Sequence, residues 1–120
     1  MEDYWKPLNE LVITPDINII HVDTRDFHYV TNIMLVRPEP KALIKEDEII
    51  PVLTDLYNKS GGNREWRMLS FDGYRDWSGS WCKYLRFYRV DKDTWSLCGQ
   101  YKNPINNWRE MFKHIKYEEL

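Results

Sequence analysis

The sequence predicts an α+β domain in which two helices cover an antiparallel sheet of four to five strands, in the order ββαβββα. Two kinds of pattern carry this prediction. Short apolar or alternating stretches indicate strands, and two stretches have the spacing of a helix with one buried side. At 120 residues the chain has the usual size of one domain, so residues 1–120 are expected to form a single globular unit.

The first two strands are predicted as a hairpin. Residues 17–22 form a short apolar run suited to a buried strand, and residues 23–26 are typical of a turn. Residues 27–37 alternate, with apolar side chains on both faces. Prolines at positions 38 and 40 end this second strand.

A helix is predicted over residues 45–59. Three acidic residues at 46–48 favour its N-terminus, where the helix dipole attracts negative charge. Because proline fits best in a first turn, Pro51 predicts a start near Glu48 or Ile50. The two glycines at 61–62 supply a stop. The predicted inward stripe is Val52, Leu53, Leu56 and Tyr57.

The second half predicts three strands, over residues 64–71, 81–90 and 94–101, and a final helix. A polar turn at 91–94 joins the last two strands as a hairpin. Asn103 and Pro104 predict the start of a helix, with Asn103 as the N-cap and Pro104 as the first helical residue. The predicted core stripe of this helix, which runs to the end of the chain, is Ile105, Trp108, Phe112 and Ile115.

The hairpin turn predicts a register in which Val90 lies opposite Trp95. This register places Cys82 and Cys98 on opposite faces, so the two thiols are expected to stay free, although a three-residue turn would shift the pairing by one. One face is then expected to be core: Cys82, Tyr84, Arg86, Tyr88, Trp95, Leu97, Gly99 and Tyr101. The other is mixed: Trp81, Lys83, Leu85, Phe87, Arg89, Ser96, Cys98 and Gln100.

Charge and apolar patterning restrict the class of protein. The net charge is −2, with −5 over residues 1–59 and +3 over residues 60–92, which argues against a general polyanion binder but allows a local basic patch. No secretory signal precedes the first element, and no apolar run has the ~20 residues of a membrane span. We therefore expect a soluble, cytoplasmic protein with reduced thiols and no membrane partner.

The strongest functional signal lies in residues 64–101, which hold ten of the eighteen aromatic side chains, interleaved with arginine and lysine. Aromatic and guanidinium groups are enriched at binding hot spots. The loop 72–80 and the mixed hairpin face are therefore the predicted contact region. Its partner-binding residues are Tyr74, Arg75, Trp77, Trp81, Lys83, Phe87 and Arg89.

Catalytic signals are weaker. His21, Asp23 and His28 in the segment HVDTRDFH could bind a metal or act as acid and base, but a polar hairpin turn explains the same residues. Cys82 or Cys98 could be a nucleophile if a neighbour stabilised the thiolate, and His114 is the nearest candidate, but neither cysteine lies at a helix N-terminus and ordinary buried thiols explain both. No cofactor is predicted.

Three functions are consistent with these observations. The first is a non-enzymatic protein-binding module, such as an inhibitor, immunity-type or adaptor protein. The alternative is a single-stranded nucleic-acid-binding domain that uses the aromatic-basic sheet face, and the third is a small metal- or cysteine-dependent enzyme. No motif is specific enough to assign a family, although small aromatic-rich domains are frequent among phage and bacterial-conflict proteins, a compositional association only.

Overall fold

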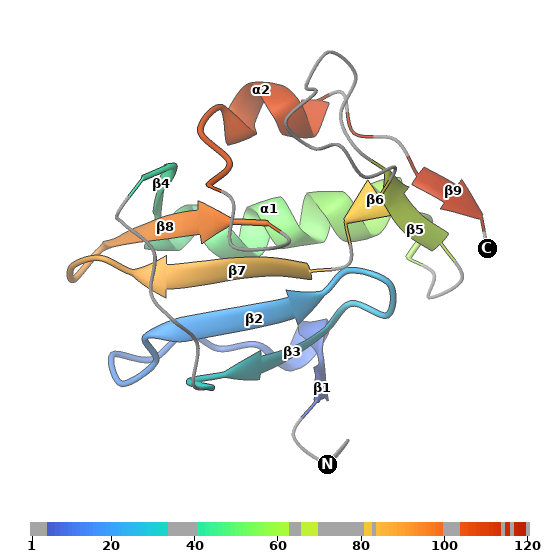
Figure 1. Ribbon diagram of the computed structural model, residues 1–120. Helices are drawn as coiled ribbons and strands as arrows, with labels where there is room; N and C mark the ends of the chain where they lie inside the picture. Colours follow the sequence, from blue (N-terminus) through green and yellow to red (C-terminus); the bar gives the residue numbers. More distant parts are fainter. Residues whose placement is uncertain are drawn as a thin grey trace.

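The α+β class is confirmed by a computed structural model, in which an antiparallel six-stranded sheet is accompanied by two helices (Figure 1). The strand count is slightly higher than predicted and the element order differs. The structure describes residues 5–33, 41–62, 66–69, 81–82, 84–99, 104–113, 115 and 117–119, and only the backbone of 66–69, 81–82 and 118–119.

The six-stranded sheet has the order β1-β3-β2-β7-β8-β4, and all its neighbouring strands are antiparallel. A short 3-10 helix follows β1 at Leu8–Glu10. The strands are β1 (Lys6–Pro7), β2 (Ile19–Asp23), β3 (His28–Thr31), β4 (Leu43–Lys45), β7 (Tyr84–Arg89) and β8 (Thr94–Cys98).

The predicted first hairpin is present as β2 and β3, with Val22 opposite Tyr29. Asn32 closes the open end of this hairpin, because its side-chain oxygen accepts backbone N–H groups of Asn18 and Ile19 at 2.8 and 3.2 Å. Asn32 has a φ of 56°, a left-handed conformation that asparagine adopts more readily than most residues. Strand β3 therefore ends at Thr31, and most of the predicted remainder lies outside the described residues.

The central helix α1 spans Glu46–Lys59 and starts earlier than Pro51 predicted. The start is fixed by the Glu48 carboxylate, which accepts the backbone N–H of Lys45 at 3.0 Å. Pro51 is accommodated in the second turn, so the proline rule gave the wrong start. The buried residues of α1 are Ile49, Leu53 and Leu56, and Figure 1 shows the helix lying behind the six-stranded sheet.

The hairpin of β7 and β8 is present, but the predicted register is wrong by one residue. Arg89 pairs with Trp95, and Phe87 pairs with Leu97. A shift of one residue changes which side chains share a face, because side chains alternate along a strand. Phe87 therefore lies on the same face as Trp95 and Leu97, which is the core face, rather than beside Ser96 and Cys98.

The predicted strand over residues 81–90 is divided between two sheets. Its beginning forms β6 (Trp81–Cys82), which pairs with β5 (Trp66–Leu69). The rest forms β7. Strand β5 also pairs with β9 (Tyr117–Glu119), so the second sheet has the order β6-β5-β9.

The last helix is shorter than predicted. Helix α2 spans Trp108–Lys113, because Pro104 forms a bridge with Cys98 and the N–H of Ile105 donates to the carbonyl of Leu97 at 3.0 Å. The chain therefore continues along β8 before it turns into a helix. The predicted stripe residues Ile105, Trp108 and Phe112 are nonetheless buried in the core.

The core lies between α1, α2 and one face of the six-stranded sheet, with Trp95 and Leu97 fully buried. Trp108 joins α2 to this core, since its indole N–H donates to the carbonyl of Leu43 at 2.9 Å. Neither helix in the described part of the chain has the length and apolar character needed to cross a membrane.

Candidate functional site

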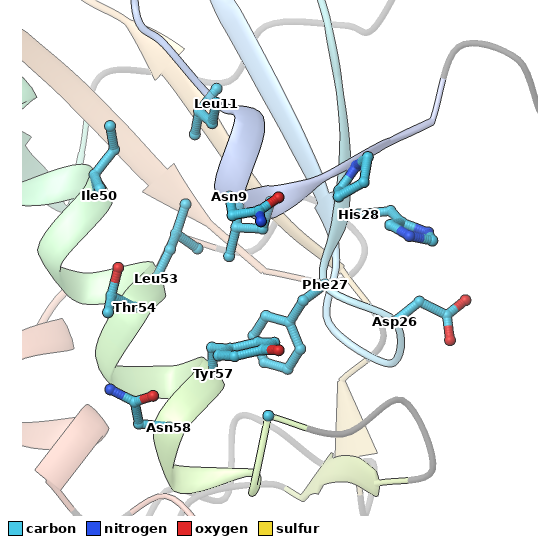
Figure 2. A pocket seen from close by; sticks show the side chains of 13 residues that line it. Asn9, Leu11, Asp26, Phe27, His28, Ile50, Leu53, Thr54, Tyr57 and Asn58 are labelled. Carbon is cyan, nitrogen blue, oxygen red and sulfur yellow. The ribbon is translucent and has the colours of Figure 1, made fainter.

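A cleft of about 680 Å³ opens between α1 and the segment that connects β1 to β2 (Figure 2). This volume is within the ~300–1,000 Å³ usual for ligand sites. Three parts of the chain that are distant in sequence form it: the β1 segment, the β2–β3 turn and α1. Its lining residues are Pro7, Leu8, Asn9, Leu11, Asp26, Phe27, His28, Ile50, Leu53, Thr54, Tyr57, Asn58 and Gly62.

The floor of the cleft is apolar and buried, whereas its walls are apolar and accessible. Leu11, Phe27 and Leu53 are 7, 2 and 1 % exposed. Ile50 and Tyr57 on α1 are 42 and 40 % exposed. Large apolar side chains at the mouth of a concave apolar surface are typical of a site that receives an apolar group.

The β2–β3 turn places Phe27 in the floor through an unusual backbone conformation. Phe27 has a φ of 52°, which is rare for a bulky residue and costs about 1–2 kcal/mol. Its carbonyl accepts the N–H of Leu8 at 2.9 Å, so the turn is attached to the 3-10 helix. This attachment brings the β1 segment and the turn together on the same side of the cleft.

Helix α1 contributes the aromatic wall. The Tyr57 ring meets Phe27 edge-on, with 5.3 Å between ring centroids and an angle of 89° (Figure 2). Gly62 allows this position, because a Cβ atom there would lie 2.9 Å from Cε2 of Tyr57. The sequence predicted Tyr57 as an inward residue, but it lies at the edge of the core and forms part of the cleft.

The rim of the cleft is polar and has little positive charge. Asn9, Thr54 and Asn58 are exposed, and Asp26 is the single carboxylate among the lining residues. The described lining contains no lysine or arginine. Figure 2 shows Asp26 and His28 on the side of the cleft opposite α1. Such a rim complements a cationic group better than an anionic one.

A second groove of about 620 Å³ lies between α1 and α2, but one ion pair and one hydrogen bond bridge it. Arg109 of α2 contacts Glu48 of α1 at 2.7 Å. Lys59 donates to the carbonyl of Phe112 at 2.5 Å and contacts Asp55 at 3.3 Å. The charged groups of this groove therefore hold the two helices together, so the first cleft is the better candidate site.

Two of the predicted contact residues have structural roles. Phe87 is fully buried under α1, so it is not part of an exposed face. The Arg89 guanidinium contacts Glu46 at 2.6 Å, lies 4.5 Å from the centroid of Trp95, and donates to the carbonyls of Ile17, Lys92 and Thr14. Both residues stabilise the hairpin and its contact with α1.

The side chains of the other predicted contact residues are not described by the structure. Tyr74, Arg75, Trp77 and Lys83 lie outside the described residues, and Trp81 is described as backbone of β6 only. Their role in partner binding stays a prediction from the sequence.

Asp23 and His28 of the candidate metal residues lie directly opposite each other on β2 and β3, and His21 lies two residues before Asp23, but their side chains make other contacts. Asp23 accepts Nε and Nη2 of Arg25 at 3.3 and 3.1 Å. The His21 ring stacks on Tyr84 with 4.7 Å between centroids. His28 lines the cleft instead. Among the residues that the structure describes, no group of three or more histidine, cysteine or acidic side chains is placed to hold a metal ion.

Cys98 is a buried free thiol. Burial raises its pKa, and the hydrogen bond from Ser96 and the charge of Arg86 only partly oppose that shift. A raised pKa keeps the sulfur protonated near neutral pH, which disfavours a nucleophilic role.

The cleft was not predicted from the sequence, although the position of Ile50 is a signal for it. Ile50 is a large apolar residue outside the predicted stripe of α1, so a helix with a single buried side would leave it in solvent. Such a residue beside an inward stripe can mark a second apolar surface. The rest of the cleft depends on Leu8, Phe27 and Leu53 meeting in space, which no local pattern indicates.

Comparisons with known proteins give no relative: no family model, no curated protein and no solved structure matches this chain.

Proposed function

We propose that this chain is a non-enzymatic protein-binding module, of the inhibitor, immunity-type or adaptor kind, and that the cleft beside α1 receives its partner. The observation that carries the proposal is the buried apolar floor of Leu11, Phe27 and Leu53 below the exposed walls of Ile50 and Tyr57. Anchoring side chains in protein interfaces fill such apolar depressions.

The charge of the cleft indicates the chemistry of the partner. Asp26 is the only carboxylate among the described lining residues, which include no lysine or arginine. A partner segment that carries one large apolar side chain next to lysine or arginine would place the first in the cleft and the second near Asp26. We therefore propose a basic-apolar segment of a protein as the occupant.

The same features favour a protein over a single-stranded nucleic acid. Nucleic-acid sites combine lysine or arginine with exposed aromatic rings on which bases stack. The cleft lining provides no such cation. On the sheet face that suggested nucleic-acid binding, Phe87 is buried and Arg89 is held by Glu46.

A selection from a random peptide library tests this proposal. The immobilised protein should enrich peptides in which a large apolar residue is adjacent to lysine or arginine. Binding of an enriched peptide should weaken by at least about tenfold in Thr54→Arg, because the long cationic side chain would occupy the cleft and repel the peptide. Asn106→Arg makes the same change of charge at an exposed site outside the cleft lining and should bind as the unmodified protein does.

Asp26→Asn isolates the contribution of the Asp26 charge to peptide binding, because it leaves the apolar lining of the cleft unchanged. Peptides with a basic residue should bind the variant a few-fold more weakly, with a smaller dependence on salt. The proposal is wrong if the library yields no ligand, or if Thr54→Arg and Asn106→Arg bind the enriched peptide equally well.

A further inference from the structure

The face of the sheet opposite α1 carries a row of polar side chains that the proposed function does not use. His21 on β2 pairs with Arg86 on β7, and Arg86 pairs with Cys98 on β8. Residues directly opposite each other in neighbouring strands share a face, and so do residues two apart along one strand. Tyr88 therefore lies on this face beside Arg86, and Tyr84 lies on its other side.

Three polar atoms in this row are buried and have no hydrogen-bond partner among the residues that the structure describes. They are Nδ1 of His21, Nε of Arg86 and the hydroxyl of Tyr88. His21 is 7 % exposed and Tyr88 is fully buried. Buried polar groups in proteins are nearly always hydrogen-bonded, so three orphan groups on neighbouring positions need an explanation. A bound group that hydrogen-bonds to all of them is the simplest one.

The charge of the row indicates what that group is. The Arg86 guanidinium donates from Nη1 to the carbonyl of Gly99 at 3.0 Å and lies 5.7 Å from the centroid of Tyr84. Within the described part of the chain it has no carboxylate partner, whereas Arg25, Arg89 and Arg109 each have one. A partly buried guanidinium is stabilised by an anion, and its planar fork suits an oxyanion.

Three side chains around Arg86 are neutral near pH 7, and the Asp23 carboxylate on the same face already pairs with Arg25. Burial and the charge of Arg86 together lower the pKa of His21 to about 4, against an opposing effect of Asp23. Burial raises the pKa values of Tyr88 and Cys98, and the charge of Arg86 partly offsets both shifts. Arg86 is thus close enough to act on all three side chains, and no carboxylate among the described residues forms an ion pair with it.

From this geometry we propose that His21, Arg86 and Tyr88 form a site for a small oxyanion, a carboxylate or a phosphate. Nε–H of Arg86 donates the charge-assisted hydrogen bond, and the Tyr88 hydroxyl donates a second one. Neutral His21 donates a third when its proton is on Nδ1. Arg86 and Tyr84 are partly exposed, so solvent reaches this side of the sheet.

A titration of isotope-labelled protein, followed by nuclear magnetic resonance, tests the site. Sodium phosphate and sodium acetate are added separately in bis-tris buffer at pH 7, with sodium chloride at equal ionic strength as the control. We expect saturable shifts of the His21 imidazole and of the Arg86 and Tyr88 amides with an oxyanion but not with chloride. A response to phosphate alone identifies a phosphate site, and a response to acetate identifies a carboxylate site.

Arg86→Gln removes the charge and retains a side chain of similar polarity. It should weaken oxyanion binding by about tenfold or more. Arg109→Gln removes an exposed arginine from another surface and should leave the binding unchanged. Shifts that are linear in concentration, shifts equal to those of chloride, or equal binding by the two variants would overturn the proposal. The titration of the unmodified protein decides the question even if Arg86→Gln does not fold.

Discussion

Protonation of His21 should destabilise this protein as the pH falls. The imidazole is buried on the sheet face opposite α1 and stacks on Tyr84. Burial first, and then the positive charge of Arg86, lower its pKa from the ordinary value of 6.5 to about 4, although Asp23 acts in the opposite direction. The folded state therefore favours the neutral imidazole, whereas the unfolded state has no such preference.

The sign of the effect follows from proton binding. Between pH 6.5 and about pH 4 the unfolded chain protonates His21 and the folded chain does not, so the free energy of unfolding falls as the pH falls. Above this window His21 contributes no dependence on pH, and below it the loss is complete. A pKa difference of about 2.5 corresponds to a total loss of about 3 kcal/mol, of which about 2 kcal/mol appears between pH 7 and pH 5.

Urea denaturation in bis-tris buffer at constant chloride measures this effect. His21→Gln cannot be protonated, so its free energy of unfolding should fall by about 2 kcal/mol less than that of the unmodified protein between pH 7 and pH 5. Carboxylates titrate in both proteins, and comparison of the two removes their contribution. Parallel curves for the two proteins, or an imidazole that titrates near pH 6.5 by nuclear magnetic resonance, would refute the reasoning.

Two further substitutions test how the core and the cleft are supported. Arg89→Ala should lower the free energy of unfolding by about 2–3 kcal/mol, because this mostly buried guanidinium pairs with Glu46 and binds three backbone carbonyls. Arg109→Ala should cost less than about 1 kcal/mol, because Arg109 also pairs with a glutamate and lies over a tryptophan ring but is mostly exposed. Equal losses in urea denaturation would contradict this assignment. Gly62→Ala should cost about 1–2 kcal/mol and also weaken binding of the cleft peptide, because the new Cβ displaces Tyr57. Gly61→Ala, also at positive φ (77°), is the matched control, and equal peptide binding by both variants would argue against a role for Tyr57.

The parts of the fold that the sequence predicts correctly are those set by local patterns. The hairpin of β2 and β3 follows from an apolar run, a turn and an alternating run. The buried side of α1 follows from helical spacing, since Leu53 and Leu56 are among the predicted inward residues. At one position the secondary structure is wrong but the predicted burial is right. Ile105 lies in an extended segment rather than a helix, yet it is in the core because its apolar side chain determines that outcome.

The parts that fail depend on contacts between distant segments. The start of α1 is set by a single side-chain hydrogen bond from Lys45 to Glu48, which overrides the preference of Pro51 for a first turn. The cleft requires Leu8, Phe27 and Tyr57 to meet in space. Phe27 does so with a positive φ, a conformation that its residue type disfavours. No local sequence pattern around Phe27 indicates this conformation.

The register of the β7–β8 hairpin has the largest consequence for function. With Val90 opposite Trp95, Phe87 and Arg89 would face outward as an aromatic-basic surface, and Arg86 would belong to the core. The observed pairing of Arg89 with Trp95 reverses this assignment. It buries Phe87 beneath α1 and places Arg86 between His21 and Cys98 on the opposite face. One residue of register therefore removes the most obvious argument for nucleic-acid binding, because strand periodicity moves every side chain of the hairpin at once. It also leaves Arg86 without a carboxylate partner among the described residues, and this is the arginine from which an oxyanion site is inferred.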